Sequence, residues 1–334
     1  MRLPARLCLA LAAPVALAAL GCGGSAPAPP VHVPRPAPAS GAAAPSPHAP
    51  SRPARVTARV IGRLAAAIQD PATAALGGNA ILAGGLDSAD VSVASILRVE
   101  PGRTVRAGSL PRPVHDAAAA STSRAAYLFG GGDGGSSSAA IVRISPPGGV
   151  VGRLPRGASD VTAAALAGTL YVVGGYDGRR PLDTIVGWRP GRPARVVARL
   201  PQPLRYVAVA AVAGRLLVAG GTNGVAATSA VYSWAPGERR ARRIGSLPAP
   251  LAHAMAAALG DTVYVLGGRG SAQNTQERSA FAVDARSGRV TSAGRLPFAL
   301  SDSGSVSLGG RILLFGGRDR AGHVHDDIVE VRPR

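Results

Sequence analysis

Short apolar runs, each ended by glycine, proline or a polar bend, follow one another from about residue 53 to the end of the chain. Runs of this length between turn residues predict β-strands joined by tight turns. A clear example lies between Leu154 and Leu200, where an alanine-rich run, an apolar run and two further runs are separated by Gly168, Asp177-Gly178 and Pro190-Gly191. We expect four short antiparallel strands there, at residues 161–166, 170–173, 184–188 and 195–199.

The same pattern occurs six times. Each copy opens on a leucine, followed by proline in most copies, and reaches a pair of glycines after a second apolar run. The leucines are Leu64, Leu110, Leu154, Leu200, Leu247 and Leu296. The glycine pairs begin at Gly84, Gly130, Gly174, Gly220, Gly267 and Gly316, always 20 residues after the leucine, whereas the full period varies between 44 and 49 residues. Each repeat therefore has a first half of constant length and a second half of variable length, which indicates a fixed pair of strands followed by loops of different length.

Four strands per repeat and six repeats predict an all-β, six-bladed β-propeller over residues 53–334. The first run of each copy is rich in alanine, as expected of strands that converge on a central axis, and larger apolar residues occupy the second and third runs. The sixth copy stops after a third run at residues 327–331, while residues 55–63 have strand character before the first leucine. We therefore expect this N-terminal strand to complete the last blade and close the ring, which leaves no free sheet edges there.

A glycine pair after an apolar strand, a downstream aromatic or aliphatic strand and a closing leucine-proline resemble the kelch repeat. The resemblance covers about residues 55–333 and implies a six-bladed propeller similar to those of bacterial secreted kelch proteins. One feature departs from that family: the usual tryptophan of the fourth strand is replaced by Val105, Val196 and Val290, and the two tryptophans, Trp188 and Trp234, fall in third strands.

The glycine pairs do not predict phosphate-binding loops, because no helical pattern follows them to supply free amides. Close packing at a strand end is the better interpretation. A more informative position lies six residues after each leucine, where the chain carries Asp70, Asp116, Asp160, Tyr206, His253 and Asp302. These residues open the innermost strand, so we expect all six at one mouth of the central channel. They can bind a cation, an amine or sugar hydroxyls; alternatively, each aspartate caps backbone amides of the next blade connection.

The preceding positions make this mouth polar and varied, with Gln69, His115, Ser159, Arg205, Ala252 and Ser301. We include Arg205 among the candidate ligand-binding residues. His115 and Asp116 are not expected to form a dyad, because adjacent residues on a strand face opposite ways. His323 and His325, near Asp326 and Asp327, form either a weak metal site or, as we favour, a solvated loop. The sequence assigns no catalytic residue, no metal site and no cofactor.

Composition adds a strong positive charge: the chain has 37 basic residues, all arginine, against 18 acidic ones, for a net charge of +19. Such a field favours anionic partners. Because the arginines are scattered over all repeats and few aromatic residues are available for stacking, we do not expect nucleic-acid binding.

The N-terminus has the features of an export signal. Arg2 and Arg6 precede an apolar run from Leu7 to Leu20, which predicts a signal peptide over residues 1–21. Ala19-Leu20-Gly21-Cys22 resembles the lipobox of bacterial lipoproteins and predicts lipidation of Cys22, with ordinary cleavage and secretion as the alternative. Residues 22–52, rich in Pro and Ala, predict an extended spacer. We therefore expect an extracytoplasmic, monomeric, membrane-anchored protein.

Two functions from different classes remain. The first is a non-catalytic surface propeller that presents loops to a protein or glycan partner. The second is a carbohydrate-acting enzyme, epimerase- or mutarotase-like, since kelch propellers include galactose oxidase and a sialic acid epimerase. The two cysteines, Cys8 and Cys22, lie in or next to the signal, so the mature domain lacks the thiol that oxidase chemistry of that kind needs. Tyr206, Arg205 and His253 are the candidates for an epimerase-like acid and base, and the sequence favours the scaffold.

Overall fold

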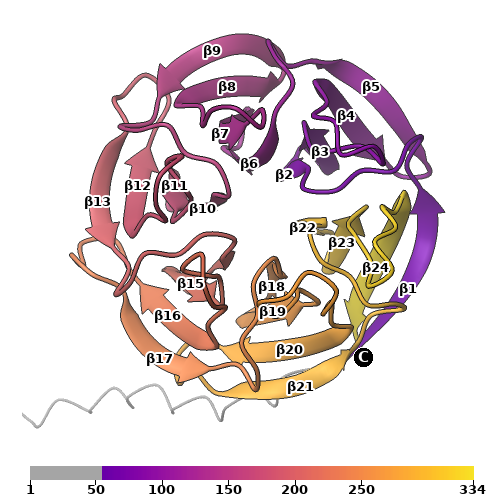
Figure 1. The fold of residues 1–334 in the computed structure, drawn as a ribbon, viewed down its shortest axis with the longest axis vertical. Helices are drawn as coiled ribbons and strands as arrows, with labels where there is room; N and C mark the ends of the chain where they lie inside the picture. Colours follow the sequence, from indigo (N-terminus) through magenta and orange to yellow (C-terminus); the bar gives the residue numbers. More distant parts are fainter. Residues whose placement is uncertain (1–54) are drawn as a thin grey trace, which may run out of the picture. The chain divides into compact units, whose positions relative to one another are not determined.

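The computed structural model describes residues 55–334, and every regular element in this range is a β-strand (Figure 1). The strands form six separate four-stranded sheets arranged as blades around a central channel. The predicted all-β, six-bladed propeller is therefore confirmed. Within this range, no segment forms an apolar helix of the length that crosses a membrane. The signal peptide, the lipidation of Cys22 and the spacer were predicted for residues outside the described range.

Blades 1 to 5 are each built from four consecutive strands that run from the axis to the rim, whereas blade 6 combines three consecutive strands with β1. Blade 1 contains β2 (Ala72–Leu76), β3 (Asn79–Ala83), β4 (Ser95–Glu100) and β5 (Arg103–Ser109). Blade 2 contains β6 (His115–Ser121), β7 (Ala126–Gly132), β8 (Ala140–Ser145) and β9 (Pro147–Arg153). Blade 3 contains β10 (Thr162–Leu166), β11 (Thr169–Val173), β12 (Thr184–Trp188) and β13 (Arg195–Arg199). Blades 4 and 5 contain β14 (Ala208–Val212), β15 (Arg215–Ala219), β16 (Ala230–Trp234) and β17 (Arg242–Ser246); and β18 (Met255–Leu259), β19 (Thr262–Leu266), β20 (Ser279–Asp284) and β21 (Val290–Arg295). Blade 6 contains β22 (Gly304–Leu308), β23 (Arg311–Phe315), β24 (Asp327–Pro333) and, outermost, β1 (Val56–Arg63).

The glycine pairs join neighbouring blades. In the sixth copy the N–H of Gly317 donates to the carbonyl of Ile68, four residues after Leu64, at 2.8 Å. A Cβ placed on Gly316 would lie 2.0 Å from that same carbonyl oxygen, and Gly316 has φ +61°. Equivalent bonds run from Gly85, Gly131, Gly175, Gly221 and Gly268 to Val114, Ala158, Leu204, Leu251 and Leu300. The constant 20-residue spacing reflects the hairpin of the first two strands, since the position five after a leucine bridges the position after the glycine pair of the same copy, as in Gln69–Leu86 and Ser159–Tyr176.

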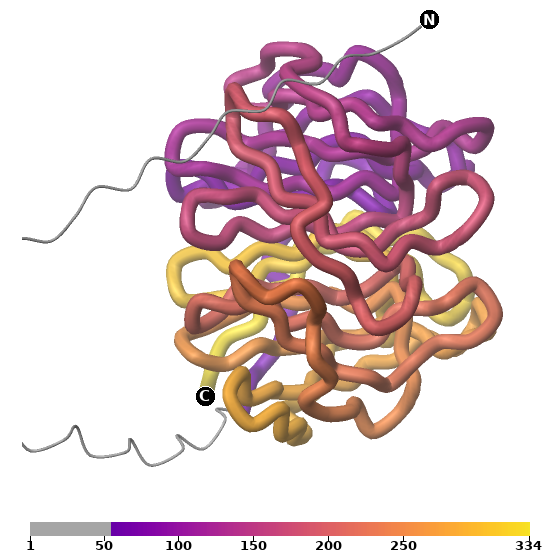
Figure 2. The backbone as a smooth tube through the Cα atoms, turned by 90° about the vertical axis from the view of Figure 1, so that its left-hand side faces the viewer, coloured from indigo at the N-terminus to yellow at the C-terminus, as the bar shows by residue number. Residues whose placement is uncertain are grey.

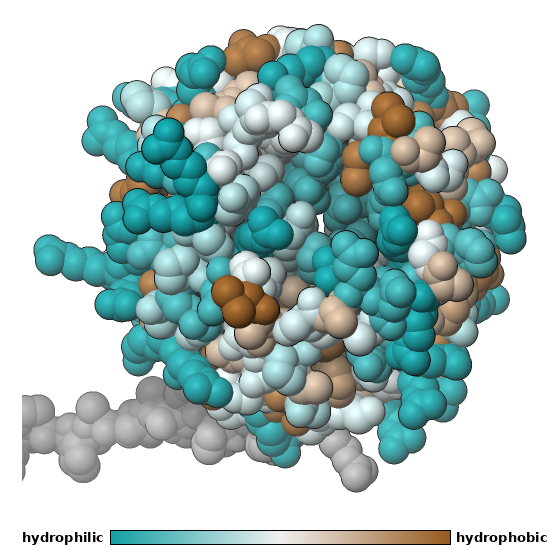
Figure 3. All heavy atoms as spheres, viewed as in Figure 1, coloured by the Kyte–Doolittle hydropathy of each residue, from teal (hydrophilic) through white to brown (hydrophobic). Residues whose placement is uncertain are grey.

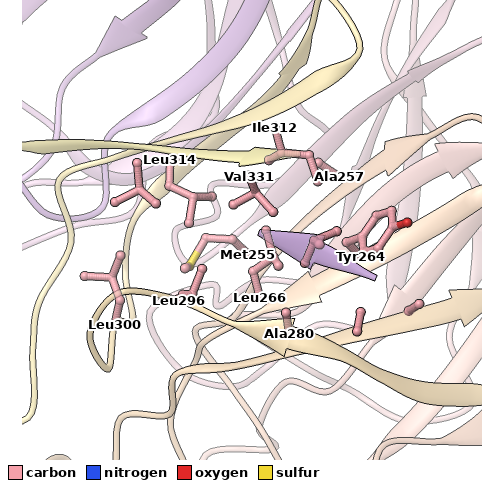
Figure 4. Close-up of a cluster of buried hydrophobic side chains, with 14 residues drawn as sticks. Met255, Ala257, Tyr264, Leu266, Ala280, Leu296, Leu300, Ile312, Leu314 and Val331 are labelled. Atoms are coloured by element: carbon pink, nitrogen blue, oxygen red, sulfur yellow. The ribbon is translucent and has the colours of Figure 1, made fainter. Parts of the chain in front are cut away.

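The hydrophobic core is divided into six clusters rather than one. The cluster in Figure 4 contains Met255 and Leu266 from blade 5, Leu296 from the connection, and Ile312 and Leu314 from blade 6. Each cluster of this kind excludes water from the space between two sheets, at about 25 cal/mol per Å² of apolar surface. The stability of each blade therefore depends on its neighbours.

The two tryptophans contribute to this packing from third strands. Trp188 packs edge-on against Tyr127 of the preceding blade, with ring centroids 4.9 Å apart, and Trp234 does the same with Tyr171 at 5.0 Å. Aromatic pairs of this geometry add about 0.5–1.5 kcal/mol beyond the buried area. The third strand thus supplies the inter-blade aromatic contact that the valines of the fourth strands do not make.

The ends of the described chain meet in blade 6, where β1 (indigo) lies beside β24 (yellow) in Figures 1 and 2. The two strands are antiparallel, from Val56 opposite Pro333 to Arg63 opposite Asp327. A register shift interrupts the pairing between Val60 and Gly62, and the third and fourth strands of the other five blades carry a similar shift. Such bulges increase the local twist of the sheet. The geometry of β1 is therefore that of a fourth strand.

Glu330 of β24 is a buried carboxylate at this closure. Its side chain is 2% exposed and lies 3.2 Å from Arg59 of β1, 2.8 Å from Arg311 and 2.7 Å from Arg332. Burial alone would raise the pKa of Glu330, but the hydrogen bonds from Arg332, Arg311 and Arg59 outweigh it and lower the pKa. We expect Glu330→Gln to destabilise the fold by roughly 1.5–3 kcal/mol at pH 7, the range for hydrogen bonds to a charged group.

Thermal melts at several pH values would test this. Because the folded-state pKa is lowered, the carboxylate stabilises the fold above the unfolded pKa of about 4.3 and loses that effect as the pH falls through the folded-state pKa. The difference in Tm between wild type and Glu330→Gln should therefore shrink at pH 3. The control is Glu100→Gln, because the side chain of Glu100 is 16% exposed against 2% for Glu330; its Tm should barely change. A constant difference from pH 7 to pH 3 would contradict the assigned role.

Candidate functional site

The six residues predicted for the channel mouth do form a ring around the axis. Asp116 is the second residue of β6, and the other five lie two residues ahead of β2, β10, β14, β18 and β22. All six have a left-handed backbone, with φ between 52° and 57°. Side chains disfavour this region, at a cost of roughly 1–3 kcal/mol per residue, and such residues cluster at functional sites.

Backbone hydrogen bonds hold the ring together. The N–H of Asp70 donates to the carbonyl of Asp302 at 2.7 Å, and similar bonds run from Asp302 to His253, from His253 to Tyr206 and from Tyr206 to Asp160, at 3.1–3.2 Å. The side chains of Asp116, Asp160 and Asp302 contact those of Tyr206, Arg205 and His253 rather than backbone amides, which differs from the capping arrangement. The left-handed backbone accompanies main-chain hydrogen bonds between neighbours in four of the six steps around the ring.

The ring side chains line one cavity of about 160 Å³ along the axis, together with small residues of the innermost strands such as Ala118, Ala163 and Ala256. On the face shown in Figure 3, hydrophilic side chains surround the small opening at the centre of the ring. The alanine-rich strands thus leave space at the axis, and the ring supplies its polar chemistry.

The carboxyl groups of Asp70 and Asp116 are buried close to other negative charges. Burial raises the pKa of Asp70 well above its ordinary value, and the negative charges of Asp302 and Asp116 raise it further. Burial likewise raises the pKa of Asp116, with added repulsion from Asp160 and Asp302. The ring therefore concentrates negative charge inside a protein whose overall charge is strongly positive.

On the opposite side of the ring, His253 is the centre of a polar network. Its Nδ1 contacts Asp302 Oδ1, and its Nε2 accepts a hydrogen bond of 2.8 Å from Arg269. Ser301 Oγ donates to the other oxygen of Asp302 at 2.6 Å. Burial would raise the pKa of Asp302, but the charge of His253 and hydrogen bonds from His253 and Ser301 lower it. The acceptor role of Nε2 assigns the proton to Nδ1, facing Asp302.

Tyr206 links this network to the acidic side. Its ring stacks on His253, with centroids 3.6 Å apart, and its hydroxyl donates to Asp116 Oδ2 at 3.1 Å. Burial and the charge of Asp116 raise the pKa of Tyr206 far above its ordinary value. The phenol is therefore a hydrogen-bond donor and not a base.

Arg205 lies beside the ring. Its guanidinium is 3.1 Å from Asp160 Oδ2, and it sits over the rings of Tyr176 and Tyr206 at 5.0 and 5.1 Å. This cation–π contact and the ion pair hold the arginine at the mouth. Arg205 thus joins the six ring residues as predicted by position, and their role in ligand binding stays a prediction.

His115 and Asp116 are not within hydrogen-bond distance of each other, yet their side chains do not face opposite ways. His115 Nε2 lies 3.7 Å from Asp116 Oδ2, although adjacent residues of a regular strand point to opposite faces. The left-handed backbone of Asp116, φ 54°, breaks that alternation. His115 also contacts Ser92 Oγ through Nδ1 at 2.8 Å, and burial lowers the pKa of its imidazole.

The second histidine pair is only partly a solvated loop. His323 is 78% exposed, but His325 is 18% exposed, stacks on Phe298 and lies 2.9 Å from Asp327. Both imidazoles also approach Asp319, at 3.3–3.4 Å. Among residues 55–334, the cluster that brings three metal-ligating atoms within 4.8 Å of one another is instead Asp70, His253 and Asp302.

Sequence reasoning missed Arg269 and Tyr176. Each follows the second glycine of its pair, and residues at this position form a β-bridge with the residue just before the ring, as in Ala252–Arg269 and Ser159–Tyr176. The repeat spacing could have identified them, because the position after each glycine pair lies beside the position five residues after each leucine.

Comparisons with known proteins agree with this architecture. A family model described as the Kelch motif matches residues 157–186, within the third repeat. The solved structure titled "Structure of YjhT" aligns with a TM-score of 0.68 over 82% of this chain and 97% of that chain, at 13% sequence identity. A search of curated proteins finds no match. At this identity the structural likeness concerns the fold alone.

Six four-stranded blades around a polar channel define a six-bladed β-propeller. The kelch motif matches the third copy, and the leucine and glycine-pair frame of that copy recurs five more times along the chain. The chain is a six-bladed β-propeller with a kelch motif in its third repeat.

Proposed function

We propose that this propeller is a non-catalytic scaffold that binds a protein or glycan partner at the channel mouth and the loops around it. The observation that carries the proposal is the rigid ring of six left-handed polar residues, held by backbone bonds at the centre of one face. Strained backbone retained at one end of the channel in all six blades is expected where a surface is shaped for a ligand.

The loops that surround the ring are the six segments after the glycine pairs, here called the mouth loops: residues 86–94, 132–139, 176–183, 222–229, 269–278 and 318–326. Several are held by a side chain at their start. Asp177 Oδ1 accepts the amides of Arg179 and Arg180 at 3.0 and 2.9 Å, and Asn223 Oδ1 accepts two amides of its own loop in the same way. Loops fixed in this manner lose less entropy on binding.

The mouth loops expose groups suited to a partner. Val225 is 88% exposed and Val91 57% exposed, and Arg179 and Arg180 extend into solvent. Exposed apolar tips among arginines favour a partner with an apolar contact and negative charge, in line with the net charge of +19.

The second candidate function, an epimerase- or mutarotase-like enzyme, is favoured by one observation. His253 is buried between Asp302 and Arg269 and faces the channel, which is an arrangement that could move a proton. We rank it second because both nitrogens of His253 and the hydroxyl of Tyr206 are already bound within the protein.

The site of action that we propose is the outer surface of the cell membrane, with the chain exported by residues 1–21 and anchored by a lipid on Cys22. Secretion after ordinary cleavage is the alternative. Metabolic labelling with a fatty-acid analogue, compared between wild type and Cys22→Ala, distinguishes the two.

A glycan array and a pull-down from envelope extracts, followed by titration of the partner identified, would test the binding proposal. Val225→Asp should weaken that interaction at least tenfold, because it removes an apolar contact and adds a charge like that of the partner. The matched control is Val197→Asp on β13, where the valine is 44% exposed on the outer rim; it should leave the affinity unchanged.

A panel of sugar epimerisation and mutarotation assays completes the test. Turnover by the wild type that is abolished by His253→Ala, with the fold retained, would defeat the scaffold and establish the enzyme. Equal loss of affinity in Val225→Asp and Val197→Asp would place the interaction away from the mouth loops.

A further inference from the structure

Three side chains of metal-ligating type meet on the wall of the axial channel. Asp302 comes from the start of blade 6, Asp70 from blade 1 and His253 from blade 5, and each offers one ligand atom within 4.8 Å of the other two. All three line the cavity. Two carboxylates and an imidazole at this spacing can bind one ion together, because each metal–ligand bond is about 2.0–2.2 Å long.

The backbone fixes these three residues without help from an ion. The N–H of Asp70 bonds to the carbonyl of Asp302 at 2.7 Å, and the N–H of Asp302 bonds to the carbonyl of His253 at 3.2 Å. The side chains of His253 and Asp302 are each 8% exposed. A ligand set held in this way loses little freedom when an ion binds.

A second, separate observation is a buried carboxylate oxygen in the same channel that accepts no hydrogen bond. Asp160 is 5% exposed and lines the cavity, yet its buried Oδ2 atom makes no hydrogen bond. The guanidinium of Arg205 approaches that atom to 3.1 Å as an ion pair without hydrogen-bond geometry. The oxygen thus has a cation beside it but still lacks a hydrogen-bond donor, which buried polar atoms ordinarily have. Water bound to a metal ion in the channel would supply the donor.

We propose that Asp70, His253 and Asp302 bind one divalent transition-metal ion of the Mn²⁺ or Zn²⁺ class in the axial channel. The imidazole selects these ions over Ca²⁺ and Mg²⁺, which prefer oxygen ligands alone. Three protein ligands leave coordination positions for water, and that water faces the carboxylates of Asp116 and Asp160. Binding requires both ligand carboxylates ionised and the ligating nitrogen of His253 unprotonated. Nδ1 would bind the ion as part of a neutral imidazole once its proton moves to Nε2 and the guanidinium of Arg269 turns away from that nitrogen.

The position of the ion gives it a structural consequence. Asp302 lies just ahead of β22 in blade 6 and Asp70 just ahead of β2 in blade 1, and the chain joins these two blades through residues 64–71, between β1 and β2. An ion bound by both residues would add a second link between the two blades, at the axis. Because the ion binds the folded ring and not the unfolded chain, it should stabilise the fold in proportion to the logarithm of its concentration. This consequence is independent of whether the mouth loops bind a partner.

The test uses the full chain without a histidine tag, stripped with a chelator and titrated separately with Mn²⁺, Zn²⁺, Ca²⁺ and Mg²⁺. We expect Mn²⁺ or Zn²⁺ to raise the Tm progressively and to bind with a stoichiometry of one per chain by calorimetry. Asp70→Asn and His253→Gln should each weaken binding at least tenfold. X-ray absorption of the zinc-loaded protein should show one imidazole among oxygen ligands.

The matched control is His325→Gln. His325 is also largely buried, at 18% exposed, and also contacts two carboxylates, Asp319 and Asp327; its substitution should leave ion binding intact. If His325→Gln abolishes binding and His253→Gln does not, or if absorption shows two imidazoles, the assignment is overturned. Absence of both a Tm shift and binding heat with every ion overturns it as well. Because Asp70→Asn exchanges one oxygen for an amide of the same size, circular dichroism of that variant separates loss of binding from loss of fold.

Discussion

Gly316→Ala should lower the Tm of the propeller by roughly 6–15 °C, the largest effect expected of a single methyl group in this protein. The new Cβ would lie 2.0 Å from the carbonyl oxygen of Ile68, on a residue with φ +61°. Backbone must therefore move on one side of the joint between blades 6 and 1, and the hydrogen bond from Gly317 to Ile68 is weakened. The left-handed alanine and the displaced carbonyl together cost about 3–4 kcal/mol.

The control for this substitution is Gly168→Ala. Gly168 has a similar φ of +72° but no atom within 4 Å of its added Cβ. It measures the conformational cost alone, about 1 kcal/mol. Thermal melts of both variants by circular dichroism decide the matter, and equal losses would show that the carbonyl contact contributes nothing.

Deleting residues 53–63 should lower the Tm by more than about 10 °C and promote association. The deletion removes β1, leaves β24 with an unpaired edge, exposes the cluster around Val56 and takes Arg59 from the buried Glu330. An equal deletion of residues 42–52 controls for length. Melting temperatures and light scattering of the two chains provide the readout, and unchanged stability without β1 would defeat its role in closing the ring.

The blades could be predicted well from the sequence because the same local pattern occurs in every copy. The first two strands of a copy form a hairpin of constant length, so counting 20 from Leu154 finds Gly174. The four strands predicted in that copy correspond to β10 to β13 with shifts of at most one residue at their ends. Residues such as Ala164 and Tyr171, paired across β10 and β11, follow from the same size gradient.

The side-chain contacts of the site were harder to predict. Position along the chain placed Tyr206 in the ring, but only the folded blades bring its hydroxyl to Asp116, 90 residues away. The contact between His115 and Asp116 depends on a left-handed backbone, which aspartate adopts more readily than most residues but does not by itself establish. To predict that Arg269 contacts the ring, one must know which loop position lies beside it.

The backbone N–H of Arg334 donates to the carbonyl of Arg55 at 2.6 Å. The described chain therefore enters and leaves the propeller at one point, on the outer edge of blade 6. Topologically the domain is a loop whose two ends coincide, so its order of blades could begin at another joint without changing a single contact between sheets. The channel mouth, by contrast, lies on the propeller axis and is formed by all six blades, away from this point on the rim.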